Sequence, residues 1–196
     1  MEKPRLLQRS AETPASSNAT AVKKTLNTPL KRSDNPLISP TVVDHLNYRI
    51  EQEELSSRLY LSMSLWLNNE GYTGAASLWK KYSDEELSHA DWVRTYLLSF
   101  GIQPLTPALT QPQQLFKGLP EIIELSYDHE TTISEQIKTI AADAFKSGDH
   151  MLYELTLKYL KEQVEEHDKM QTWMDKLSAF GTDKIALRLL DNEMAG

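Results

Sequence analysis

The chain has 196 residues, of which 40% are hydrophobic and 25% charged, an ordinary balance for a domain with a substantial apolar core. Cysteine is absent, which excludes disulfides, thiolate zinc sites and rubredoxin-like iron centres, so Glu, Asp or His must hold any metal. No apolar run approaches the ~18 residues of a membrane helix, and none near the start is typical of a signal peptide. We therefore expect a cytoplasmic protein without membrane contact.

The formal charge of −7 is unevenly distributed. Residues 1–36 hold seven basic and three acidic side chains and four of the nine prolines, so this segment carries +4 and the remainder −11. Its weak periodicity and many Ser, Thr and Asn residues predict a flexible basic extension. A targeting peptide is the competing interpretation, which Glu2 and Glu12 weaken. Because an acidic body attracts cations, nucleic-acid contact is expected only through the extension.

Glycine and proline beyond residue 36 occur where a helical protein needs breaks, with no proline between 41 and 103 or after 120. Because interior Gly and Pro are costly in a helix, this spacing predicts a few long helices over residues 37–196. Ser39 before Pro40 is a favourable helix start, as is Asp149, and Gly101 is a natural terminator. In chain order, we expect helices over about residues 40–69, 73–100, 120–147, 150–180 and 182–193.

The stretch 102–119 joins the second and third of these helices. It holds three prolines and cannot be helical throughout. Helices of roughly 28 residues span about 42 Å, a distance that an extended segment of this length can cover. The sequence therefore predicts an all-α fold, a four-helix bundle of two hairpins joined by one long crossover, with a short fifth helix at the C-terminal end.

Each of the four long helices carries a carboxylate midway along its apolar face: Glu53, Glu86, Glu130 and Glu166. One such residue is ordinarily at the edge of the apolar stripe with its head in water. Four carboxylates at matching depth are a different case from one, because buried carboxylates repel one another and destabilise the fold unless they are neutralised. We expect no Lys or Arg on the inner faces nearby, so the pattern predicts divalent cations.

The sequence Glu86-Leu87-Ser88-His89 places a carboxylate and an imidazole three residues apart on one helix. This spacing aims both side chains at one metal ion, although such a pair alone also occurs by chance. Combined with carboxylates at matching depth on the other three helices, it predicts a di-metal site.

Over about residues 38–193 the chain resembles the bacterial non-haem ferritins, members of the ferritin-like di-iron carboxylate family. The matching strings are Glu53-Glu54-Leu55-Ser56-Ser57 with Tyr60, Glu85-Glu86-Leu87-Ser88-His89, Tyr127-Asp128-His129-Glu130 and Glu162-Gln163-Val164-Glu165-Glu166. The resemblance implies a ferritin-like bundle and iron storage with ferroxidase activity, the oxidation of Fe(II) by O2 or peroxide. It also implies a homo-oligomeric cage, with 24 subunits, that holds ferric oxyhydroxide.

The resemblance also implies roles for individual residues. It implies a di-iron site whose ligands are Glu53, Glu86, His89, Glu130 and Glu166. Glu86 would bridge the two irons, Gln163 would contact the site through its amide, and Tyr60 would be hydrogen-bonded to it. A third iron site on the inner side of the bundle would comprise Glu85, Glu162, Glu165 and Glu166. The alternative for this third cluster is an ordinary solvated acidic face.

Two departures from the haem-containing bacterioferritins oppose haem. Leu87 stands where they carry a methionine ligand, and the Glu-x-x-His pattern is not repeated at 163–166. We therefore expect two irons per subunit, a weaker third, and no haem. Two alternatives remain open: a ferritin-like cage with a protective or DNA-associated role through the basic extension, and another di-iron enzyme such as an oxygenase or peroxidase.

Overall fold

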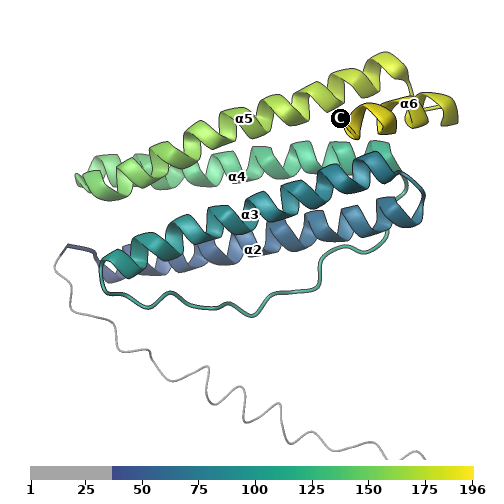
Figure 1. Cartoon of the computed structure of the whole chain (residues 1–196). Coiled ribbons are helices and arrows are strands. Elements are labelled where there is room, and N and C mark those ends of the chain that lie inside the picture. The colour runs from purple at the N-terminus through teal and green to yellow at the C-terminus, as the bar shows by residue number, and fades with distance from the viewer. Residues whose placement is uncertain (1–36) are drawn as a thin grey trace, which may run out of the picture. The chain divides into compact units, whose positions relative to one another are not determined.

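The computed structural model describes residues 37–196, and the interpretation of residues 1–36 as a flexible extension lies outside them. Five helices and no strand occur in this range. Figure 1 shows how the helices are arranged. They are α2 (Pro40–Asn69), α3 (Thr73–Ser99), α4 (Leu119–Ser147), α5 (His150–Phe180) and α6 (Lys184–Met194). In the same range, no helix combines the length and apolarity needed to cross a membrane.

The helix ends follow the capping residues in the sequence. The Ser39 side chain accepts a hydrogen bond from the backbone N–H of Val42, and Pro40 occupies the first turn of α2. Gly148 ends α4 in a left-handed conformation, with φ of 74°. The last helix begins slightly later than predicted because Asp183 is its N-cap. The predicted helices are confirmed, with boundaries within about two residues.

The topology is that of two hairpins joined by a crossover. Helix α2 packs against α3, and α4 packs against α5. The non-helical connection from α3 to α4 runs along the bundle in Figure 1. The backbone N–H of Leu105 donates to Asn47 Oδ1 at 2.8 Å, and Ser62 Oγ donates to the carbonyl of Gln113 at 2.5 Å. The connection therefore follows α2 from its first turns towards its last, as a crossover requires.

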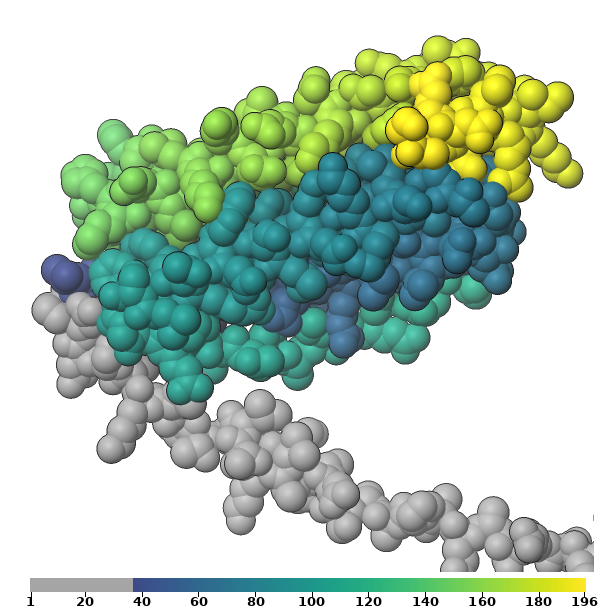
Figure 2. All heavy atoms as spheres, viewed as in Figure 1, coloured from purple at the N-terminus to yellow at the C-terminus, as the bar shows by residue number. Residues whose placement is uncertain are grey.

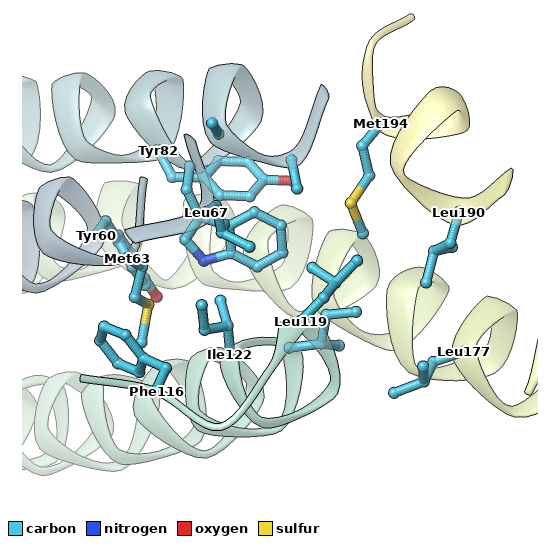
Figure 3. Packing of buried hydrophobic residues seen from close by; sticks show 14 of the residues in the cluster. Tyr60, Met63, Leu67, Tyr82, Phe116, Leu119, Ile122, Leu177, Leu190 and Met194 are labelled. Atoms are coloured by element: carbon cyan, nitrogen blue, oxygen red, sulfur yellow. The ribbon is translucent and has the colours of Figure 1, made fainter. Parts of the chain in front are cut away.

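The core consists of two apolar clusters. One cluster includes Leu67, Trp79 and Met170, all fully buried. Figure 3 shows part of this cluster, with Leu67 labelled. The other includes Ile50 and Val93, also fully buried. In sequence, a group of buried polar residues lies between the two clusters on each long helix: Glu53, Glu86, His89, Glu130, Gln163 and Glu166. These residues form a polar layer across the middle of the bundle.

Helix α6 lies against α3 and α5 at one end of the bundle, as Figure 2 shows. Its buried face comprises Ala186, Leu187, Leu190, Asp191 and Met194. Leu190 and Met194 extend the first apolar cluster (Figure 3). The Asp191 carboxylate accepts a hydrogen bond from the backbone N–H of Ala75 at 2.8 Å, so α6 caps the start of α3. A Cβ added at Gly74 would lie 2.0 Å from the backbone oxygen of Asp191, so the two backbones meet where only glycine fits.

Candidate metal centre

All four long helices contribute buried side chains to the polar layer. Exposed fractions are 1% for Glu53 and Glu130, 4% for Glu166, 5% for Glu86 and 6% for His89. The prediction that the four carboxylates face the interior is therefore confirmed. Their assignment as iron ligands is a separate question, to which geometry and charge contribute.

Glu53, Glu86 and His89 form the tightest group. One carboxylate oxygen or ring nitrogen from each lies within 4.8 Å of those of the other two, the only such trio among residues 37–196. The Nδ1 atom of His89 lies 3.2 Å from Glu86 Oε2. Two carboxylates and an imidazole are donors that suit iron, so these residues fit a first metal position.

The His89 ring is held by aromatic neighbours. Its centroid lies 4.7 Å from that of Trp92 and 6.1 Å from that of Tyr159. The Tyr159 hydroxyl also donates a hydrogen bond of 2.5 Å to the backbone carbonyl of His89. These contacts fix the turn of α3 that carries the imidazole, which favours a defined metal-ligand geometry.

In the other half of the site, Glu130 accepts hydrogen bonds from two neighbouring side chains. The Tyr60 hydroxyl donates to its Oε1 atom, and the Gln163 amide donates to its Oε2 atom at 2.9 Å. Ser134 Oγ donates to Gln163 Oε1 at 3.2 Å, which turns the amide nitrogen towards Glu130. The structure thus brings Tyr60 and Gln163, both named through the family resemblance, onto one carboxylate of the layer.

Burial of so many carboxylates raises their pKa values. Burial raises the pKa of Glu86 well above its usual range, and the charges of Glu53 and Glu130 raise it further. Burial likewise raises the pKa of Glu130 to about 7, although the hydrogen bond from Tyr60 opposes the shift. Burial is also the largest cause of the raised pKa of Glu166. Bound cations would relieve this accumulation of negative charge, so the electrostatics favour metal binding.

The expectation of no Lys or Arg near these carboxylates is wrong. Arg49 is 2% exposed, and its Nε atom lies 2.8 Å from Glu53 Oε1. Lys169 Nζ lies 2.8 Å from Glu166 Oε1. Long basic side chains extend well beyond their own backbone positions, so the apolar stripe alone does not reveal them. A search at three- and four-residue spacing from each glutamate would have named both as candidate partners, although spacing alone does not show that the contacts form.

The four residues predicted to hold a third iron do not meet at one point. Glu165 is exposed, and Glu162 Oε1 lies 4.0 Å from His89 Nε2. Glu85 and Glu166 share a partner instead, because Lys169 Nζ lies 3.4 Å from Glu85 Oε2. A third metal at these acids stays a prediction. Any such site has to accommodate Lys169, which lies between Glu85 and Glu166.

Residues 43–180 match the Ferritin-like domain family, a span that contains every residue of the polar layer. The chain belongs to the ferritin family. This ferritin is 32% identical over 158 residues to a probable bacterial non-heme ferritin-like protein of Haemophilus influenzae, an alignment that covers 81% of this chain and 96% of the relative. It is 31% identical over 155 residues to a bacterial non-heme ferritin of Campylobacter jejuni, with coverages of 79% and 93%.

Solved structures give the same result. An open pore ferritin from the hyperthermophilic archaeon Archaeoglobus fulgidus superimposes with a TM-score of 0.78 at 30% identity, over 81% of this chain and 97% of that one. The predicted family and the ferritin-like bundle are therefore confirmed. Membership of this family supports iron storage as the broad role of the protein, and the polar layer contains a candidate metal site of carboxylates and a histidine.

Proposed function

We propose that this ferritin oxidises Fe(II), its substrate, at a di-iron site in the polar layer and stores the ferric product inside a homo-oligomeric shell. The observation that carries the proposal is the convergence of Glu53, Glu86 and His89, whose ligand atoms lie within 4.8 Å of one another. A buried layer with one such trio and two further carboxylates offers enough donors for two iron ions.

In the proposed mechanism, Glu53 and His89 bind the first iron, and Glu130 and Glu166 bind the second. Glu86 bridges the two, and the charges of Glu53, Glu130 and Glu166, which raise its pKa, support this central position. Anionic carboxylate ligands favour Fe(III) over Fe(II) and so drive oxidation. Two Fe(II) ions side by side can give two electrons to one molecule of O2 or peroxide.

Tyr60 and Gln163 serve as positioning residues in this proposal. Each donates a hydrogen bond to a different oxygen of Glu130, which limits how far that carboxylate can rotate. The ferric product has to leave the site. The Glu130 side chain would have to break one of these two hydrogen bonds to move with the departing iron. The side chain can therefore hold Fe(II) in a defined place and still release the product.

The storage part of the proposal needs a closed assembly. Helix α6 buries one face within the chain and leaves Ile185 74% and Leu189 49% exposed. Exposed apolar side chains on a helix of 11 residues are suited to contacts between subunits. The proposed assembly is the 24-subunit cage that the resemblance implies, with Ile185 and Leu189 among its buried contacts.

The experiment is an anaerobic Fe(II) titration of the assembled apoprotein, followed by exposure to air. Two irons per subunit and rapid formation of an amber ferric product are expected. Glu86→Ala is expected to lose the rapid phase and still assemble, because it removes the bridging ligand. Relief of buried negative charge should leave its metal-free form at least as stable as the wild type.

Glu124→Ala is the matched control, since it removes one carboxylate from an exposed position of α4 and should oxidise Fe(II) like the wild type. Unchanged oxidation kinetics in Glu86→Ala would reject the assignment of the bridge. An assembled wild type that oxidises no Fe(II) would favour the protective cage instead.

A further inference from the structure

Lys169 lies between two of the acids that the family resemblance assigns to a third iron site. Its Nζ atom is 2.8 Å from Glu166 Oε1 on its own helix and 3.4 Å from Glu85 Oε2 on α3. Both are distances of an ion pair, so the ammonium bridges two of the four acids named for that site. The bridge joins the two hairpins of the bundle beside the polar layer.

The ammonium is more confined than a typical surface lysine head. Its side chain is 32% exposed, compared with 69% for the neighbouring Lys81. The Nζ atom also lies 5.8 Å from the centre of the Tyr82 ring, within the range of a cation–π contact. Trp173 Nε1 donates to the Tyr82 hydroxyl at 3.1 Å, which holds the ring in place. Two carboxylates and an aromatic face together define a position for a monovalent cation.

We propose that the Lys169 ammonium is a built-in cation that takes the place of the third metal and limits tight divalent-metal binding to two ions per subunit. This inference rests on the proposed function, because it concerns the acids next to the same di-iron site. A divalent ion between Glu85 and Glu166 would need the same carboxylate oxygens and would be repelled by the ammonium. It can bind there only after the lysine side chain has moved away.

The arrangement also gives Glu166 two partners. One carboxylate oxygen binds Lys169, which leaves the other for the second iron of the di-iron site. Glu85 is not a proposed ligand of the di-iron site, and its other oxygen lies 3.7 Å from Nζ of the exposed Lys81. The positive charges of Lys169 and Lys81 therefore balance the negative charges of Glu85 and Glu166 before any metal binds.

The test counts divalent metals with Zn(II), which is redox-inert and therefore separates binding from oxidation. Isothermal titration calorimetry on the assembled, full-length, metal-free protein is expected to give two tight Zn(II) ions per subunit. Lys169→Met should give a third, and a crystal of that variant soaked in Zn(II) should show density between Glu85 and Glu166. Lys169→Arg keeps the positive charge and should bind two.

Lys81→Met is the matched control. It removes the same charge from the other oxygen of Glu85, but from an exposed side chain, and should bind two Zn(II) ions. Two ions in Lys169→Met, three in the wild type, or three in Lys81→Met would each overturn the inference. A wild type that binds two Zn(II) ions but fails to oxidise Fe(II) would reject only the proposed oxidation.

Discussion

Arg49→Met should destabilise the metal-free ferritin far more than the metal-loaded one. The Arg49 guanidinium is 2% exposed and Glu53 is 1% exposed, with Nε and Oε1 separated by 2.8 Å. The contact is ionic, because Nε, Nη2 and Glu53 Oε1 have no hydrogen-bond partner among residues 37–196. Nη1 donates to Gln136 Oε1 at 2.8 Å, which anchors the guanidinium. Methionine fills similar space without charge and would leave Glu53 unpaired beside three other carboxylates.

The magnitude follows from the cost of an uncompensated buried charge. Breaking a buried ion pair by removal of one partner costs about 3–5 kcal/mol. For a domain of this size, each kcal/mol lowers the melting temperature by about 2–4 °C, so the metal-free variant should melt roughly 6–20 °C lower than the wild type. Glu53 belongs to the proposed first metal position. A metal bound there would neutralise its charge, so the difference in the loaded protein should be much smaller.

Differential scanning calorimetry of the chelator-treated and Zn(II)-loaded proteins, at equal subunit concentration, measures both differences. The matched control is the double variant Arg49→Met with Glu53→Gln, which removes both charges and should recover most of the loss in the metal-free state. Equal losses with and without Zn(II) would show that Arg49 acts through packing rather than charge. No loss in the metal-free protein would refute the argument altogether.

Other predictions concern pH, the α6 joint and the chain ends. In the folded metal-free protein the pKa of Glu130 is about 7, compared with an ordinary 4.5. The stability that protonated Glu130 contributes is therefore fully present below pH 4.5 and is lost as pH rises through about 7. Melting curves measured against pH should show this loss of stability, and Glu130→Gln should make the loss smaller. Asp191→Ala removes the acceptor for the Ala75 N–H and should cost about 1–2 kcal/mol in denaturant unfolding, whereas Asp191→Asn, which keeps an acceptor, should cost less. On size-exclusion chromatography, removal of the residues after Gly181 should weaken the shell and removal of residues 1–36 should spare it; the reverse result would contradict both expectations.

The sequence predicted the helices well because their boundaries depend on local chemistry. Ser39, Pro40 and Asp149 act within one turn of their own positions. The depth of Glu53 and Glu130 was also predictable, because both fall on apolar stripes that must face the core. Local capping and helical periodicity are therefore sufficient for the fold and for the carboxylates of the layer.

The basic partners were missed for a physical reason. A stripe locates the Cα atom of a residue, whereas the charged atoms of Arg49 and Lys169 lie several bonds away from it. The position of Arg49 beside the stripe does not determine whether its guanidinium points into water or towards Glu53. Only packing between helices decides this, and it also brings Lys169 within reach of Glu85 on α3.

The contact between Gly74 and Asp191 has a consequence for sequence variation. The close approach at this joint is between backbone atoms, 2.0 Å from where a Cβ at Gly74 would lie. The exposed residues of α6, such as Ile185 and Leu189, can therefore be exchanged without altering the angle at which this helix leaves the bundle. A single methyl group at position 74 would instead collide with the backbone oxygen of Asp191 and push α6 away from α3. The direction of α6 therefore depends on the glycine at position 74 and not on the exposed residues of this helix.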